Sequence, residues 1–286
     1  MIRQLLLSSR PLSWVNTAFP FAAGYLLVTR EVDLVFVLGT LYFLIPYNLA
    51  MYGINDVFDY ESDMRNPRKG GVEGAVLDKS LHRITLWAVV ITNVPFVVFL
   101  VVVGSPLSWL VLAVSLFAVL AYSAPKLRFK ERPFIDSLTS STHFVSPAVY
   151  GLVLAGAAFT PALWAVLAAF FLWGVASHAF GAVQDIVADR EGGISSIATV
   201  IGGAATVRIA FVAYLLGGVL MLFTTWPGPL GSVLVLPYAL SVLPYWSIAD
   251  ADAERANTGW RRFLTFNFVC GFVVTMLLIW LWVLVP

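Results

Sequence analysis

The sequence has little charge and almost no cysteine. Only 12% of its 286 residues are charged and 60% are hydrophobic, with a mean hydropathy of +0.88. A soluble globular protein of this length needs far more polar surface, so the composition excludes that class and places the chain in a bilayer. The single cysteine, Cys270, lies in an apolar run, where it can neither pair within the chain nor complete a metal cluster.

Nine apolar stretches are long enough to cross a membrane. They fall at about residues 13–30, 34–54, 84–104, 107–124, 134–156, 161–184, 206–226, 229–248 and 263–285. The short alternating segments of a membrane barrel are lacking, so we predict an all-α bundle of nine transmembrane helices in one domain, residues 1–286. The first stretch has no A-x-A-like cleavage site, so we expect a retained helix and not a signal peptide.

The basic residues lie mostly on one side of this predicted bundle. The side that carries the N-terminus holds 16 of the 17 lysines and arginines, with Arg30 as the exception, and 14 of the 16 acids. Because cytoplasmic loops are rich in Lys and Arg, the N-terminus is predicted to be cytoplasmic and the C-terminus outside. We therefore expect a multi-pass cell-membrane protein in contact with the lipid bilayer, with no nucleic acid as a partner.

Two acidic motifs follow apolar stretches of even number, so both are predicted to emerge on the cytoplasmic face. After the second stretch comes N-D-x-x-D-x-x-x-D, formed by Asn55, Asp56, Asp59 and Asp63. At about 100° per residue, these four side chains share one face of a continuous helix. After the sixth stretch comes D-x-x-x-D, in which Asp185 and Asp189 are one helical turn apart.

Carboxylates gathered at the mouth of a membrane bundle are costly unless they are solvated, paired or bound to cations. The donors here are oxygen atoms only, which favours a hard cation, and Mg²⁺ commonly bridges a few carboxylates to substrate phosphates. We predict that all six motif residues bind Mg²⁺ at a diphosphate site, with Asp59 and Asp185 as catalytic residues. Solvated acids at helix ends are the alternative, which is weaker for two motifs than for one.

A basic loop follows the fourth stretch and begins with Y-x-x-x-K, formed by Tyr122 and Lys126. Its cations can neutralise diphosphate oxygens that the metal leaves exposed, and Tyr122 can donate a hydrogen bond to one of them. We predict Tyr122 and Lys126 as catalytic residues. Arg128, and Arg68 and Lys69 after the first acidic motif, are predicted to bind the diphosphate. The alternative is that these charges only determine topology.

Two polar residues lie deeper in the predicted helices. Asn48 is seven residues before Asn55, and His178 is seven before Asp185, so each lies two turns further in on its motif's face. We predict that both line a cavity beneath the metal ions and contact the substrate. The alternative is an ordinary hydrogen bond between helices.

With N-D-x-x-D-x-x-x-D, Y-x-x-x-K and D-x-x-x-D in this order, the chain resembles the UbiA superfamily of intramembrane prenyltransferases. In that family the two acidic motifs bind Mg²⁺ and a prenyl diphosphate, which the resemblance transfers to the six motif residues. Tyr122 and Lys126 match the family's tyrosine and lysine. The implied reaction is departure of Mg²⁺-bound diphosphate from an allylic carbon, followed by attack of an electron-rich acceptor.

Within that superfamily, five stretches look like those of bacterial lycopene elongases. They are residues 9–11, 14–17, 52–75, 126–136 and 140–144. This likeness implies dimethylallyl diphosphate as the donor, lycopene as the acceptor, and elongated acyclic carotenoids of the flavuxanthin and decaprenoxanthin type as products.

Three other functions stay open at this point. A quinone precursor or another lipophilic acceptor would use the same metal site. A secondary transporter binds its coupling ions near the bilayer midplane, whereas these acids lie at helix ends. A non-catalytic membrane scaffold would tolerate loss of the acids.

Overall fold

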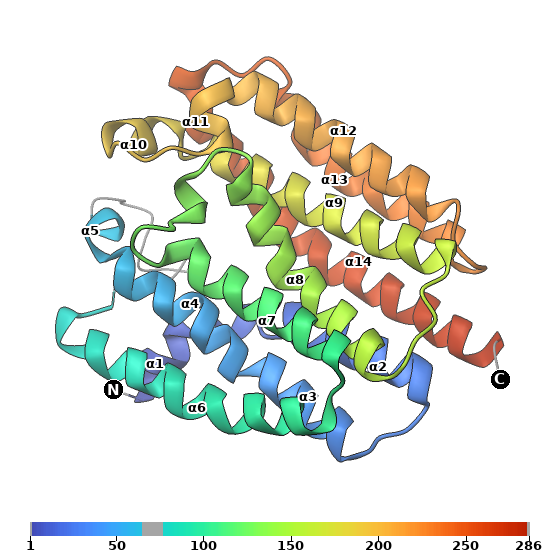
Figure 1. Cartoon of the computed structure of the whole chain (residues 1–286). Coiled ribbons are helices and arrows are strands. Elements are labelled where there is room, and N and C mark those ends of the chain that lie inside the picture. The colour runs from blue at the N-terminus through green and yellow to red at the C-terminus, as the bar shows by residue number, and fades with distance from the viewer. Residues whose placement is uncertain (1, 65–76, 285–286) are drawn as a thin grey trace. The chain divides into compact units, whose positions relative to one another are not determined.

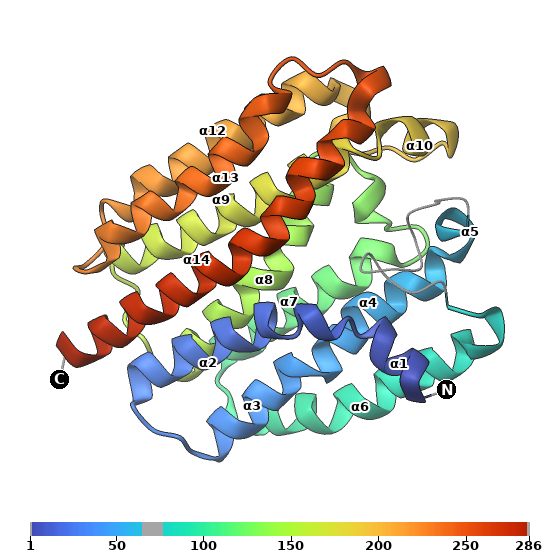
Figure 2. The ribbon, with the colours of Figure 1, turned by 180° about the vertical axis from the view of Figure 1, so that it is seen from behind.

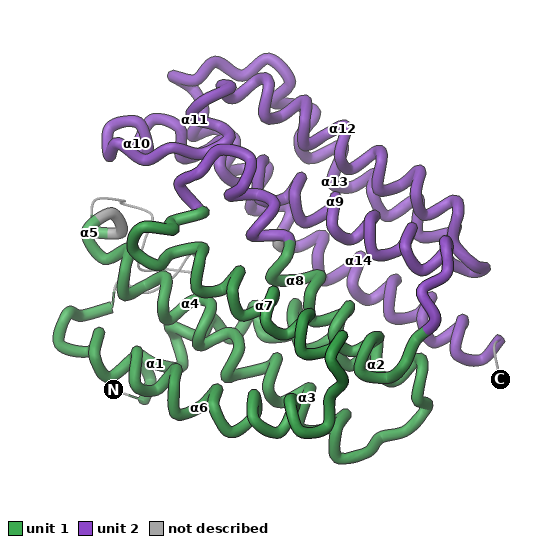
Figure 3. The backbone as a smooth tube through the Cα atoms, viewed as in Figure 1, with its two compact units in different colours: residues 1–129, 142–157 green, residues 130–141, 158–286 purple. Residues whose placement is uncertain are grey.

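A computed structural model describes residues 2–64 and 77–284, except for the side chains of residues 62, 63 and 264. In the described ranges every regular element is helical (Figure 1). The chain forms two compact units, residues 1–129 with 142–157 (unit 1) and residues 130–141 with 158–286 (unit 2) (Figure 3). Seven helical segments in the described part are long and apolar enough to cross a membrane, as a multi-pass protein requires.

Unit 1 holds the first seven α-helices and the second part of the eighth. Its elements are α1 (Ile2–Ser8), η1 (Pro11–Ser13), α2 (Val15–Thr29), α3 (Leu34–Leu44), α4 (Pro46–Phe58), α5 (Tyr60–Asp63), η2 (Lys79–Leu81), α6 (His82–Val103), α7 (Pro106–Ser123) and α8 (Ile135–Leu154) from residue 142. Polar caps define several helix starts, because the first N–H groups of a helix lack intrahelical partners. The Asp33 carboxylate accepts the N–H of Phe36 at 2.7 Å, and Ser105 forms a capping box with Ser108.

The predicted helix over residues 34–54 is two helices, because α3 ends at Leu44 and Pro46 begins α4. Proline lacks the N–H needed inside a helix but is tolerated in its first turn. Asn48 lies at this break, where its Nδ2 donates to Thr17 Oγ1 at 2.7 Å and to the Phe43 carbonyl at 2.8 Å. Asn48 is fully buried. Its amide nitrogen therefore stabilises the helix junction, and its role in substrate binding stays a prediction.

Aromatic rings fill the core of unit 1. Phe43 lies 5.1 Å from both Phe21 and Tyr47, measured between ring centroids, and Tyr150 lies 5.9 Å from Phe43. All four side chains are fully buried. Helix α2 approaches α8 closely beside this cluster at Gly151, where a Cβ atom would lie 2.6 Å from the Phe21 carbonyl oxygen. Small residues permit such contacts between membrane helices.

Gly151→Ala is therefore expected to destabilise the protein. The added Cβ meets backbone atoms of α2, which cannot move without separating the helices, so we expect a loss of about 1–3 kcal/mol. Thermal unfolding in detergent would show this as a lower midpoint. Gly271→Ala is the matched control, because a Cβ there has nothing within 4 Å. Equal midpoints for the two variants would contradict the packing described for α2 and α8.

Unit 2 contains the first part of α8 and all later helices. Its other elements are α9 (Pro161–Val183), α10 (Ile186–Glu191), α11 (Ile197–Ile201), α12 (Gly203–Met221), η4 (Gly228–Leu234), α13 (Val235–Val242), η5 (Leu243–Tyr245), η6 (Asp250–Ala256) and α14 (Asn257–Leu284). Helices α9 and α12 pack along their length, as Figures 1 and 2 both show. The predicted helix at 229–248 is divided among η4, α13 and η5.

Helices α2 and α8 cover two further predicted segments but do not belong to the seven long apolar segments. The count of nine membrane spans and the single-domain organisation therefore stay predictions. The element η3 (Phe129–Glu131) lies at the boundary between the residues of the two units.

Candidate functional site

The first acidic motif lies at a helix break in unit 1. The prediction of one continuous helix is wrong here, because α4 ends at Phe58 and α5 begins at Tyr60. Asp59 is the residue between them, and its N–H donates to the Asn55 carbonyl at 2.9 Å. Asn55 Nδ2 also donates to Asp59 Oδ2 at 2.5 Å. The two side chains therefore share a face, as predicted, although the helix does not continue through the motif.

The Asp59 carboxylate is nearly buried, with 2% of its side chain exposed, and Arg128 Nη2 lies 3.4 Å from its Oδ1. A buried carboxylate without a partner would be strongly destabilising, so this contact offsets part of its desolvation cost. Asn55 Nδ2 donates to Ser123 Oγ as well, at 2.9 Å. Because Asn55 Nδ2 donates both of these hydrogen bonds, the amide oxygen of Asn55 is the atom that could bind a cation.

Asp56 has different surroundings from Asp59. Its Oδ2 accepts a hydrogen bond from Ser8 Oγ at 2.7 Å, and its Oδ1 lies 3.4 Å from Arg10 Nη2. Ser8 and Arg10 could not be found from motif spacing, because they lie 48 and 46 residues from Asp56 in the sequence. For Arg10 the sequence held one signal, because residues 9–11 are among the stretches that look like those of bacterial lycopene elongases.

The basic loop begins where α7 ends. The Tyr122 ring, in the last turn of α7, packs edge-to-face against the His143 imidazole at 5.2 Å between centroids. Lys126 and Arg128 both have left-handed backbone conformations, with φ of 74° and 39°. Such values are uncommon for residues other than glycine and often occur at functional sites. The loop therefore places Arg128 beside Asp59 at the expense of local backbone strain.

The second acidic motif also lies at a helix break, in unit 2. Helix α9 ends at Val183 and α10 begins at Ile186, with Asp185 as its N-cap residue. The Asp189 N–H donates to the Asp185 carbonyl at 2.8 Å, so the two acids are one turn apart, as predicted. Both side chains are half-buried. The break places the pair on the short helix α10 and not on α9.

Several long-range contacts hold the segment that carries this motif. Arg190 Nη2 lies 2.8 Å from Asp250 Oδ2, and Asp250 Oδ1 accepts the N–H of Gly203 at 2.7 Å. Buried Asp136, at the start of α8, accepts the N–H of Ile197 at 2.8 Å. These contacts were not predicted, because each joins positions far apart in the sequence.

His178 contacts Ser137, the residue after Asp136, in unit 2. Its Nδ1 is 3.1 Å from Ser137 Oγ, a contact between α9 and the first part of α8. Ser137 also donates its backbone N–H to Asp136 Oδ1 at 2.6 Å. The contact with Ser137 fits the interhelical alternative, and the role of His178 in substrate binding stays a prediction.

Asp136→Ala is expected to loosen the segment after the second motif. It removes the acceptor from two backbone N–H groups, those of Ser137 and Ile197, at a cost of about 1–3 kcal/mol. Hydrogen exchange of residues 192–202 should accelerate. Glu254→Ala, at an exposed acid of η6, is the control and should leave this exchange unchanged. Equal exchange rates of residues 192–202 in the two variants would contradict a stabilising role for the contact between Asp136 and Ile197.

The donor chemistry of each acidic motif suits Mg²⁺, since Asn55 with Asp59, and Asp185 with Asp189, carry oxygen ligands one helical turn apart. In the described part of the chain, no group of three or more His, Cys, Asp and Glu side chains is arranged to hold a metal ion. The predicted Arg68 and Lys69, and the side chain of Asp63, lie outside the described residues.

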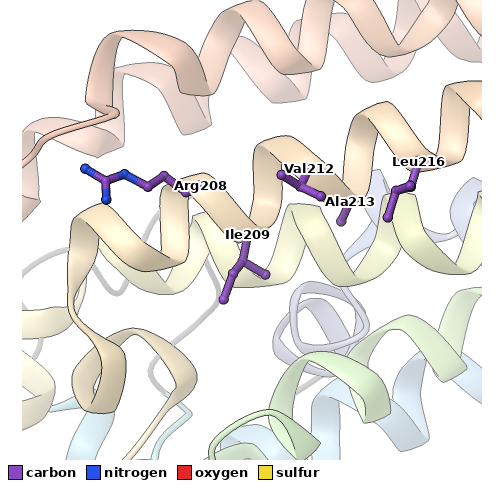
Figure 4. A pocket seen from close by; sticks show the side chains of 5 residues that line it. All are labelled: Arg208, Ile209, Val212, Ala213 and Leu216. Carbon is purple, nitrogen blue, oxygen red and sulfur yellow. The ribbon is translucent and has the colours of Figure 1, made fainter.

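An open groove of about 320 Å³ lies along α12. It is lined by Arg208, Ile209, Val212, Ala213 and Leu216 (Figure 4). None of these residues belongs to the acidic motifs or to the basic loop.

The fold and these residues define a multi-pass, all-helical membrane protein with oxygen-rich acidic motifs at the ends of two helices. The model of the UbiA prenyltransferase family matches residues 17–270. The chain therefore belongs to this family and is a prenyltransferase, which confirms the resemblance found in the sequence.

Relatives of known name narrow the comparison. A lycopene elongase/hydratase of Corynebacterium glutamicum is 57% identical over 280 residues, which are 97% of each chain. A C(50) β-cyclic carotenoids biosynthesis protein, LbtBC, of a Dietzia species is also 57% identical, over 98% of this chain and 65% of its own length. A UbiA homologue of Archaeoglobus fulgidus, solved with DMAPP and Mg²⁺, shares the fold with a TM-score of 0.69 and 18% identity, covering 93% of this chain and 98% of its own.

Proposed function

We propose that this protein transfers a dimethylallyl group from dimethylallyl diphosphate to the ends of lycopene, producing elongated acyclic carotenoids of the flavuxanthin and decaprenoxanthin type. The observation that carries this proposal is the 57% identity to a lycopene elongase/hydratase over 97% of both chains. Such identity over the whole length favours a common acceptor as well as a common reaction. The family fold alone supports prenyl transfer but not this acceptor.

The reaction breaks the bond between the allylic carbon and the diphosphate oxygen and forms a carbon–carbon bond to the terminal double bond of lycopene. Mg²⁺, when bound, would neutralise charge on the departing diphosphate. The positive charge then lies on the acceptor, where water adds its oxygen and releases a proton. The word hydratase in the relatives' names supports water addition over simple proton loss.

The residues take distinct parts in this proposal. Oxygen atoms of Asn55, Asp59 and Asp63, and of Asp185 and Asp189, would hold the metal–diphosphate group. Tyr122, Lys126 and Arg128, with Arg68 and Lys69, would bind diphosphate oxygens and so stabilise the leaving group. Asn48 and His178 would line the substrate cavity, and residues 1–286 would act as one domain.

The proposed topology has nine membrane spans, a cytoplasmic N-terminus and an active-site mouth on the cytoplasmic face. The one-sided distribution of 16 of the 17 basic residues supports this orientation. Cysteines introduced at Glu31 and at Glu254 should react with a membrane-impermeant thiol reagent from the outside and from the cytoplasmic side respectively. Labelling of both from one side would refute the topology.

Purified protein in lipid nanodiscs tests the proposed substrates. We expect Mg²⁺-dependent release of diphosphate from dimethylallyl diphosphate when lycopene is present, and its loss when EDTA removes the metal. A quinone precursor, offered in place of lycopene, should give transfer at least about a hundredfold slower. Transfer to the quinone precursor and not to lycopene would keep the enzyme class and overturn the acceptor.

A further inference from the structure

The carboxylate of Asp56 is enclosed by the N-terminal segment. None of its side chain is exposed, whereas the Arg10 side chain that faces it is 21% exposed. Ser8 Oγ donates to Oδ2 at 2.7 Å, and Arg10 Nη2 lies 3.4 Å from Oδ1. Each carboxylate oxygen therefore has a protein partner of suitable chemistry. A metal ligand at a substrate site needs at least one oxygen directed to the metal.

Arg10 is held in an unusual conformation by two contacts with α4. Its backbone φ of 50° is in the left-handed region, which residues other than glycine rarely adopt. Its guanidinium carbon lies 4.3 Å from the centroid of the Tyr52 ring, one turn before Asp56. A cation over an aromatic face is favourable, and so is its contact with the carboxylate. Strain of this kind persists only where tertiary contacts determine the conformation.

The rest of the N-terminal segment is fixed against the same region. Ser8 and Ser9 are buried, although they are polar and lie near the start of the chain. Trp14 Nε1 donates to the Ser9 carbonyl at 3.0 Å. Ser8 also lies close to Gly53 of α4, where a Cβ atom would be 3.7 Å from Ser8 Oγ. Figure 2 shows α1 beside α4.

Asp59, only three residues after Asp56, contacts Asn55 and Arg128, neither of which is among the described contacts of Asp56. The described contacts therefore differ between the two carboxylates: Asp56 contacts the N-terminal segment, and Asp59 contacts α4 and the basic loop. We propose that Asp56 is a positioning residue and not a Mg²⁺ ligand. It fixes the N-terminal segment Ser8–Arg10 to α4 and thereby holds Asn55 and Asp59 in the geometry that binds the metal–diphosphate group. The role in transfer rests on the proposed function, but the contact between Asp56 and the N-terminal segment does not.

Hydrogen exchange of the ligand-free protein tests the contact itself. Asp56→Asn and the milder Ser8→Ala should each accelerate exchange of the amides in residues 2–13, by about tenfold for the first. Asp59→Asn is the matched control and should leave these amides within about twofold of the wild type. If Asp56→Asn fails to fold, Ser8→Ala and Arg10→Gln supply the same comparison. Unchanged exchange in Ser8→Ala and Arg10→Gln would overturn the proposal.

Kinetics of the folded fraction separate positioning from metal binding and from mere stability. Asp56→Asn should lower kcat about tenfold or more, with the Mg²⁺ concentration for half-maximal activity within about twofold of the wild type. Arg10→Lys, which keeps the charge, should recover more of kcat than Arg10→Gln. A tenfold rise in the required Mg²⁺ would make Asp56 a ligand, and an unchanged kcat would make it only structural; either result overturns the proposal. If the wild type itself transfers no prenyl group, the proposed function fails, and the exchange data still decide whether Asp56 holds the N-terminal segment.

Discussion

Asp59→Asn is expected to abolish prenyl transfer, lowering the initial rate at least about 10³-fold. The substitution keeps the shape of the side chain but removes the charge that attracts a cation, in the buried position beside Asn55. The measurement is diphosphate release by purified protein in nanodiscs, with Mg²⁺, dimethylallyl diphosphate and lycopene all present.

Controls separate this loss from misfolding. Asp252→Asn changes an exposed acid of η6 and should leave the rate within about twofold of the wild type. Asp59→Asn also weakens the contact with Arg128, so Asp59→Glu serves as a second variant that keeps the charge but moves it by one methylene. It should fold and still lose about tenfold or more, because Mg²⁺ demands near-octahedral geometry. Full activity in Asp59→Asn would refute the metal-site proposal for the first motif.

Asp185→Asn is expected to lower transfer by a comparable factor, at least about 10²-fold to 10³-fold. This variant tests the second motif under milder structural conditions, because Asp185 is half-buried and its side chain does not cap α10. The thermal unfolding midpoint should therefore stay close to that of the wild type. The Mg²⁺ concentration that gives half-maximal activity should rise if any residual activity can be measured.

The neighbouring acid Glu191 provides the matched control for that variant. It lies on the same short helix but is exposed and outside the D-x-x-x-D pattern. Glu191→Gln should retain full activity. If Glu191→Gln and Asp185→Asn lost activity equally, the effect would belong to the charge of α10 as a whole, and the specific role of Asp185 would be refuted.

The sequence predicted the helical membrane fold well, because hydropathy over some twenty residues is a local property that the bilayer selects directly. It also predicted that residues within each acidic motif lie one helical turn apart. The structure shows this spacing between Asn55 and Asp59 and between Asp185 and Asp189. The positions of helix breaks were harder. Asp59 and Asp185 both lie at breaks, and nothing in a pattern of apolar residues distinguishes a helix that continues from one that restarts two or three residues later.

The contacts that position the motifs could not be predicted at all. Ser8 and Arg10 reach Asp56 across more than 40 residues, and Asp136 reaches Ile197 across 61. Such pairs depend on how helices pack, which is decided by side-chain shape over the whole unit. A helix start, by contrast, can be seen in a local pattern, as at Ser105, where a capping serine is followed by a proline in the first turn of α7.

Pigment analysis tests most directly whether this protein elongates lycopene. The wild-type gene and the Asp59→Asn variant would each be expressed in a lycopene-producing bacterial host. The extracted pigments would be separated by chromatography and their masses determined by mass spectrometry. We predict new pigments heavier than lycopene by one and by two prenyl units, carrying added water, and absent from the variant. Unchanged lycopene in cells with abundant, folded membrane protein would contradict the claim.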